Sequence, residues 1–318
     1  MILEFLFLIA GFGILIKGAD WLVSGGSALA RKYKVSELAI GLTIVAFGTS
    51  MPELVVNAFA AYQGHSDIVY GNIIGSNNFN LFLILGIAGL VTPITVQSGT
   101  VWREIPFSFL AVLMLYFLAN SFNNQAGIIT RLDAIILLIF FAGFLYYVFR
   151  QLKNDNNQQA KDQLEYTLLR ISILITGGLA FLILGGRLVV INAVSIAEAL
   201  GISQTVIALT IVAAGTSLPE LATSVVAALR KNNDIAVGNI IGSNIFNIFL
   251  ILGVSALIKP IKYNIDFNTD LFILGLGTVL VFIFMFSGKK KKLDRWEAAI
   301  LLCIFIAYTA YLVYNEMH

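Results

Sequence analysis

The stretch LTIVAFGTSMPELVVNAFAAYQGHSDIVYGNIIGSNNFNLFLILG at 42–86 recurs without a gap as LTIVAAGTSLPELATSVVAALRKNNDIAVGNIIGSNIFNIFLILG at 209–253. Well over half of the positions are identical, and the same offset carries Gly18 onto Gly185. Self-similarity at a fixed offset indicates an internal repeat. We therefore predict a duplicated chain, with a first unit at 1–150, a polar connector at 151–167 and a second unit at 168–318.

The composition of the chain indicates a membrane protein. Of 318 residues, 58% are hydrophobic and 12% are charged, whereas soluble domains carry about 25% charged residues. Apolar runs long enough to cross a bilayer predict an all-α membrane protein with ten transmembrane helices. The runs lie at 2–30, 37–62, 69–91, 102–120, 130–150, 168–196, 204–229, 236–258, 269–287 and 296–315. Five helices in each unit, an odd number, would make the second unit enter the membrane the other way round, as two inverted repeats.

The basic residues predict the orientation of these helices. Most Lys and Arg residues fall in the odd-numbered loops, including the four lysines at 289–292, and positive loops stay in the cytoplasm. This pattern predicts a multi-pass cell-membrane protein with both termini extracellular and the 151–167 connector cytoplasmic. A net charge of +2, spread over loops, does not suggest a nucleic-acid partner. The expected partner is the lipid bilayer, and no obligatory protein partner is evident.

The chain contains few residues that carry enzymatic chemistry. It has one cysteine, Cys303, and two histidines, His65 and His318. A disulfide within the chain is therefore excluded, and a zinc centre built on Cys or His is disfavoured. The sequence also lacks G-x-S-x-G and H-E-x-x-H motifs, which disfavours a hydrolase. We predict no enzymatic activity and no cofactor.

The GTSMPE motif places a carboxylate, two hydroxyls and a proline inside an apolar run. Thr49 and Ser50 precede Glu53 by four and three residues, so the three side chains share one helix face. Pro52 lacks a backbone N–H, which kinks a helix and frees a carbonyl. The second copy repeats this set with Thr216, Ser217, Pro219 and Glu220. An all-oxygen set of this kind suits a hard cation.

The GNIIGSN motif adds polar residues at four-residue spacing. They are Asn72, Ser76 and Asn80 in the first copy, and Asn239, Ser243 and Asn247 in the second. Glycine-rich stripes with Ser and Asn often serve only helix packing. A carboxylate near the centre of a membrane, however, costs about 3 kcal/mol or more and is a functional hypothesis by default. The recurrence of both glutamates therefore favours a cation site between the two copies.

These motifs resemble those of the calcium/cation antiporter superfamily, which includes the sodium/calcium exchangers. Its two inverted repeats each carry a G-T-S-x-P-E and a G-N-x-x-G-S-N element, and both copies are complete here. The resemblance implies that Glu53 and Glu220 coordinate the transported cation. It implies further oxygens from Thr49, Ser50, Ser76, Asn80, Thr216, Ser217 and Ser243, and from the carbonyls of Ala46 and Ala213. It also implies that the first and sixth helices slide against the other eight.

One position differs from some family members. Certain sodium/calcium exchangers carry an aspartate where this chain has Asn247, so the predicted site holds two formal negative charges. The resulting hypothesis is a secondary active antiporter that exchanges Ca²⁺ for Na⁺ by alternating access. An H⁺/Ca²⁺ antiporter and a K⁺-dependent Na⁺/Ca²⁺ antiporter remain open within this class. A cation channel is the alternative from another class.

Overall fold

The protein is almost entirely helical. The computed structural model describes residues 2–120, 127–154, 166–201, 213–288 and 291–317. Before the connector, π-helical turns (η) interrupt the α-helices. The elements are α1 (Ile2–Tyr33), α2 (Glu37–Ile40), η1 (Gly41–Val45), α3 (Ala46–Thr49), α4 (Met51–Gln63), α5 (Ser66–Asn78), η2 (Phe79–Ile84), α6 (Leu85–Val91), β1 (Ile94–Thr95), η3 (Thr100–Glu104), α7 (Ile105–Ala119), β2 (Ile128–Ile129) and α8 (Arg131–Asn154).

The part of the chain after the connector follows a similar order. Its elements are α9 (Leu168–Ala199), α11 (Ala213–Gly215), α12 (Leu218–Leu229), α13 (Asn233–Ile245), η5 (Phe246–Ile251), α14 (Leu252–Ile258), β3 (Ile261–Lys262), α15 (Phe267–Phe284), β4 (Lys292–Leu293) and α16 (Arg295–Met317). α1 and α9 both have 32 residues. The turns η2 and η5 lie at matching positions of the duplicated stretch, so the local distortion is duplicated as well.

Several of these helices are long and apolar enough to cross a membrane. The described residues contain eight such helices, or nine if the bent pair Glu37–Thr49 and Met51–Gln63 is counted as one span. The prediction of an all-helical, multi-pass membrane protein is confirmed. The predicted span at 204–229 ends in α11 and α12, and its first part, 204–212, lies outside the described residues.

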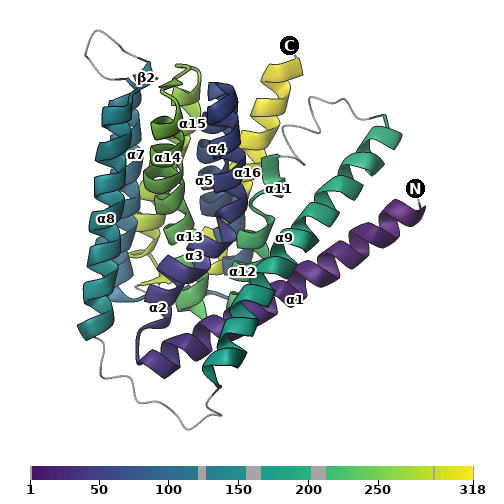
Figure 1. Ribbon diagram of the computed structural model, residues 1–318, viewed down its shortest axis with the longest axis vertical. Helices are drawn as coiled ribbons and strands as arrows, with labels where there is room; N and C mark the ends of the chain where they lie inside the picture. The colour runs from purple at the N-terminus through teal and green to yellow at the C-terminus, as the bar shows by residue number, and fades with distance from the viewer. Residues whose placement is uncertain (1, 121–126, 155–165, 202–212, 289–290, 318) are drawn as a thin grey trace.

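Helices α1 and α9 pack side by side and run obliquely along one flank of the upright bundle (Figure 1). Glycines bring their backbones together. A Cβ atom added at Gly18 would lie 2.8 Å from the carbonyl oxygen of Gly178, and one added at Gly185 would lie 2.7 Å from the backbone nitrogen of Leu15. Small residues allow such close approach between membrane helices. The duplicated pair Gly18 and Gly185 therefore holds α1 against α9.

We predict that Gly18→Val destabilises the protein. The new side chain forces α1 away from α9, and overpacking typically costs about 1–3 kcal/mol. Thermal unfolding in detergent should show a lower Tm. Gly13 is the matched control on the same helix, because an added Cβ there meets nothing within 4 Å. Equal Tm values for Gly18→Val and Gly13→Val would contradict the packing argument.

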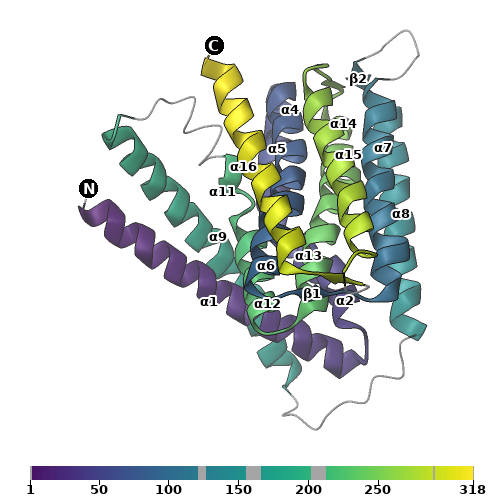
Figure 2. The same cartoon turned by 180° about the vertical axis from the view of Figure 1, so that it is seen from behind.

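Two short antiparallel ribbons join the parts of the chain before and after the connector. β1 pairs with β4, with Ile94 opposite Leu293, and β2 pairs with β3, with Ile128 opposite Lys262. The two ribbons lie toward opposite ends of the bundle (Figure 2). At each end of the bundle, therefore, a strand from before the connector pairs with a strand from after it.

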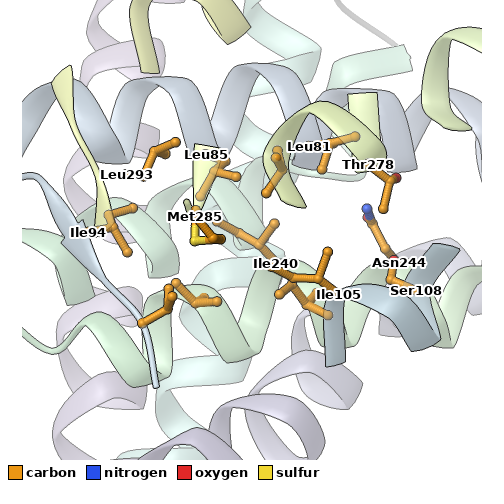
Figure 3. Close-up of a pocket in the computed structure, with 14 residues that line it drawn as sticks. Leu81, Leu85, Ile94, Ile105, Ser108, Ile240, Asn244, Thr278, Met285 and Leu293 are labelled. Atoms are coloured by element: carbon orange, nitrogen blue, oxygen red, sulfur yellow. The ribbon is translucent and has the colours of Figure 1, made fainter. Parts of the chain in front are cut away.

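The two ends of the bundle are packed differently. Beside β3, the rings of Tyr70, Tyr263 and Phe267 form a cluster, with the two tyrosine rings edge to face and 4.9 Å apart. In the duplicated unit, Val237 stands at the position that matches Tyr70, and Val96 stands at the position that matches Tyr263. These two valines line a small apolar pocket beside β1, which Figure 3 shows. At these matching positions, small side chains line a pocket beside β1, whereas aromatic rings pack together beside β3.

Candidate cation site

Both glutamates lie where a span is interrupted. α3 ends at Thr49 and α4 starts at Met51, so the helix is broken at Ser50, with a bend of 48° between its two parts. Pro52 falls in the first turn of α4, where a helix needs no N–H donor. The predicted proline kink is thus a break, and the proline begins a new helix.

The second copy has the same arrangement. α11 ends at Gly215, a turn holds Thr216 and Ser217, and α12 begins at Leu218 with Pro219 in its first turn. Glu53 and Glu220 each lie in the first turn of the helix after the break. The N-terminal end of a helix favours a negative charge, so the break helps to accommodate each buried carboxylate.

The serines at the breaks hydrogen-bond to the glutamate of the other copy. The Ser50 hydroxyl lies 2.8 Å from Glu220 Oε1, and the Ser217 hydroxyl lies 3.1 Å from Glu53 Oε1. Both carboxyl groups are 1% exposed. Each carboxylate therefore accepts a hydrogen bond from a serine of the other copy in the same chain, and the two broken helices meet at one site.

The GNIIGSN motifs complete this centre. Ser76 Oγ lies 3.0 Å from Ser217 Oγ, and Ser243 Oγ lies 3.0 Å from Ser50 Oγ. Ser243 is also 3.4 Å from Glu220 Oε1. The four serines thus form two matching pairs, one beside each carboxylate.

The threonines hydrogen-bond to the first asparagine of each GNIIGSN motif. Thr49 donates to Asn239 Oδ1 over 3.0 Å, and Asn72 Nδ2 donates to Thr216 Oγ1 over 3.2 Å. These two contacts again join positions related by the duplication. The structure therefore brings together Thr49, Thr216 and the four serines around the two carboxylates.

Several buried oxygens at this centre have no hydrogen-bond donor among the described residues. Among them are Glu53 Oε2, Glu220 Oε2, Asn80 Oδ1 and Asn247 Oδ1, each in a side chain that is 1% exposed. A buried polar atom without a partner is costly, and a carboxylate more so. A cation bound by the two carboxylates would provide a partner for their free oxygens. In the described ranges, no three or more His, Cys, Asp or Glu side chains are grouped so that they could hold a metal ion, so two carboxylates supply the charge at this centre.

The two predicted backbone ligands have different surroundings. The Ala46 carbonyl accepts from the Ser50 N–H over 3.0 Å and from the Thr49 hydroxyl over 3.3 Å. Ala213 is the first residue of α11 and directly follows residues 202–212, which are outside the described ranges. The roles of Ala46 and Ala213 as ligands stay predictions.

Four polar residues around the site were not among the predicted site residues: Asn57, Ser224, Asn77 and Asn244. Asn57 Nδ2 donates to the Glu53 carbonyl oxygen over 2.7 Å and to Asn72 Oδ1 over 2.6 Å. In the other copy Asn239 Nδ2 donates to Ser224 Oγ over 2.9 Å. The remaining two, Asn77 and Asn244, contact Asn247 and Asn80. All four are polar residues at matching positions within apolar runs, a signal that the aligned copies already contain.

A helical membrane bundle with two buried carboxylates, each hydrogen-bonded to a serine of the other copy, is the arrangement expected of a protein that handles cations within the bilayer. The family model described as "Sodium/calcium exchanger protein" matches residues 3–150 and 171–314. The chain therefore belongs to the sodium/calcium exchanger family, which confirms the predicted resemblance.

Individual relatives cover nearly the whole chain. The sodium/calcium exchanger MaX1 of Methanosarcina acetivorans is 34% identical over 349 residues, which include 98% of this chain and 99% of MaX1. The inner membrane protein YrbG of Escherichia coli K12 is 36% identical, with 98% of this chain and 97% of YrbG covered. A solved structure of the sodium-calcium exchanger NCX_Mj, soaked with zero Na⁺ and Ca²⁺, superposes with a TM-score of 0.82 at 32% identity, covering 98% of this chain and 99% of that one.

Proposed function

We propose that this protein is a secondary active antiporter that exchanges Ca²⁺ for Na⁺ across the cell membrane by alternating access. The observation that carries the proposal is the pair of buried carboxylates whose Oε2 atoms have no donor among the described residues. Membership of the sodium/calcium exchanger family and the names of MaX1 and NCX_Mj support the choice of ions. The ions are substrates, and the proposal includes no cofactor.

The charge of the site accounts for exchange. Glu53 and Glu220 supply two negative charges, which one Ca²⁺ or two Na⁺ neutralise. Because both ions need the same two carboxylates, occupancy by one excludes the other. The proposed ligands are these glutamates with Thr49, Ser50, Ser76, Asn80, Thr216, Ser217, Ser243 and Asn247, and the carbonyls of Ala46 and Ala213.

The proposed architecture is ten helices in two inverted five-helix repeats, with both termini extracellular and the connector cytoplasmic. The crossed contacts between Ser50 and Glu220 and between Ser217 and Glu53 support a twofold relation of the copies. The two ribbons, each pairing a strand before the connector with one after it, support it as well. α1 and α9 are the proposed mobile unit, because they pack closely on each other along one flank of the bundle.

Ion gradients imposed one at a time test this function. We expect proteoliposomes that contain the purified protein to accumulate Ca²⁺ when Na⁺ is higher inside than outside, because outward Na⁺ movement drives Ca²⁺ inward. K⁺ and pH gradients alone should give no uptake, and protein-free liposomes are the control. Uptake that follows a pH gradient and ignores Na⁺ would identify an H⁺/Ca²⁺ antiporter, and a requirement for K⁺ would identify the K⁺-dependent type. Ion currents that correspond to rates per protein far above the turnover rate of a transporter would identify a channel.

A further inference from the structure

Asn77 and Asn244 are buried asparagines that are not predicted ligands, and each hydrogen-bonds to an asparagine that is one. Asn80 Nδ2 donates to Asn244 Oδ1 over 3.0 Å, and Asn247 Nδ2 donates to Asn77 Oδ1 over 2.9 Å. Each contact joins one copy of the duplicated stretch to the other. Asn77 is 0% exposed and Asn244 is 3% exposed. Both side chains are therefore buried in the protein.

Two backbone carbonyls determine which way these amides point. Asn77 Nδ2 donates to the carbonyl oxygen of Asn244 over 3.3 Å, and Asn244 Nδ2 donates to the carbonyl oxygen of Asn77 over 3.4 Å. A carbonyl oxygen can only accept, so the nitrogen of each amide has to face it. The Oδ1 atoms of Asn77 and Asn244 therefore face the other way, toward Asn247 and Asn80.

The orientation passes from these two residues to the site. Facing an Oδ1 acceptor, Asn80 and Asn247 have to present their Nδ2 atoms to it, because an amide oxygen there would repel. Their own Oδ1 atoms then point away and are the ones without a donor. We infer that Asn77 and Asn244 are positioning residues, which make Asn80 and Asn247 offer oxygen rather than nitrogen to the transported cation. This inference rests on the proposed cation site.

The same contact bears on the charge of the site. A carboxylate at position 247 would place an oxygen against Asn77 Oδ1, in the place where Asn247 Nδ2 now lies at 2.9 Å. If Asn77 turned its amide over to donate, its oxygen would face the Asn244 carbonyl at 3.3 Å instead. The neutral amide of Asn247 therefore fits the orientation that Asn77 has in this structure.

Leucine is a suitable replacement at these positions, because it approximates asparagine in size and removes the amide. Asn244 lies next to Ser108 and Thr278 at one end of the apolar pocket (Figure 3), so we expect an apolar side chain to fit there. A side-chain replacement also leaves the backbone carbonyls of Asn77 and Asn244 in place. Each positioning residue can therefore be removed while the other keeps its orientation.

Ca²⁺ binding by the full-length protein in detergent, measured by calorimetry, tests the inference through double-mutant cycles. Asn77→Leu should weaken Ca²⁺ binding by about 10- to 100-fold, the usual effect of losing a group that orients a metal ligand. Combining it with Asn247→Leu should cost no more than Asn247→Leu alone, because Asn77 acts through Asn247. Combining it with Asn80→Leu should multiply the two losses, because Asn244 holds Asn80. The cycles for Asn244→Leu should give the reverse pattern.

A conservative variant separates positioning from a general structural role. Asn77→Gln keeps an amide that can turn its oxygen toward Asn247 and adds no charge, so it should restore part of the affinity that Asn77→Leu loses. Gel filtration and thermal unfolding establish that each variant is folded. If Asn77→Leu is not recovered as folded protein, Asn77→Ser, whose shorter side chain withdraws the acceptor, takes its place in the cycle.

The outcomes distinguish the inference from the proposed site. Wild-type Ca²⁺ affinity in both Asn80→Leu and Asn247→Leu would show that the site itself is misassigned. Weak binding in those two, with wild-type affinity in Asn77→Leu and Asn244→Leu, would leave the site intact and overturn the inference. Losses that multiply in every pair would overturn it too.

Discussion

Glu53→Gln and Glu220→Gln should each abolish Na⁺-driven Ca²⁺ uptake into proteoliposomes. Glutamine keeps the shape of the side chain and can still accept from Ser217 or Ser50, but it removes one of the two charges. An ion pair at 4 Å is worth about 4 kcal/mol at an intermediate dielectric, which corresponds to about a thousandfold in Kd. Because Ca²⁺ carries twice the charge of Na⁺, its binding should suffer most.

Asp67→Asn provides the control for this prediction. Asp67 lies in the first turn of α5 and is exposed, so the substitution removes a carboxylate away from the centre. We expect transport close to wild type, and gel filtration should show that all three variants are folded. Near-normal Ca²⁺ uptake by either glutamine variant would rule out the assigned site.

A disulfide between α3 and α9 should stop exchange reversibly. A Cβ atom added at Gly48 would lie 3.2 Å from Leu179 Cγ, which brings two cysteines there close to the 3.5–4.5 Å Cβ separation of a disulfide. In a Cys303→Ser background, oxidised Gly48→Cys/Leu179→Cys would attach the proposed mobile unit to the bundle. Ca²⁺ uptake should disappear on oxidation and return with reductant.

A second disulfide, within the mobile unit, is the matched control. A Cβ atom at Gly25 of α1 would lie 2.8 Å from Ile175 Cγ1 of α9, so Gly25→Cys/Ile175→Cys should crosslink these two helices. If α1 and α9 move together, this crosslink leaves uptake intact. Uptake that survives oxidation of the first pair, or is lost on oxidation of the second, would show that α1 and α9 are not the unit that moves.

The sequence predicted the architecture better than the details of the site. Apolar runs reveal helices because the bilayer leaves few alternatives for a long apolar segment, and the duplicated motif identified Glu53 and Glu220. The π-helical turns η2 and η5 were not predicted. They contain Asn80 and Asn247, and π-helical turns often occur at functional sites. Local spacing gives no sign of them.

The roles of Asn77 and Asn244 were also missed, for a different reason. Their side chains lie within the motif, but their effect depends on partners about 170 residues away in the chain. Helix periodicity assigns a residue to a face of its own helix and says nothing about what that face meets. Only the three-dimensional structure reveals which side-chain amide of one copy sets the orientation of which amide in the other.

The unequal packing of the two ends of the bundle bears on which way the protein faces at rest. If the copies are inverted repeats, a fully symmetric chain would have equal energy when open to either side of the membrane. Tyr70 and Tyr263 at one end, and Val237 and Val96 at the other, break that symmetry. Differences of this kind between the copies, and not the predicted ion ligands, which the two copies share, would then bias the resting direction.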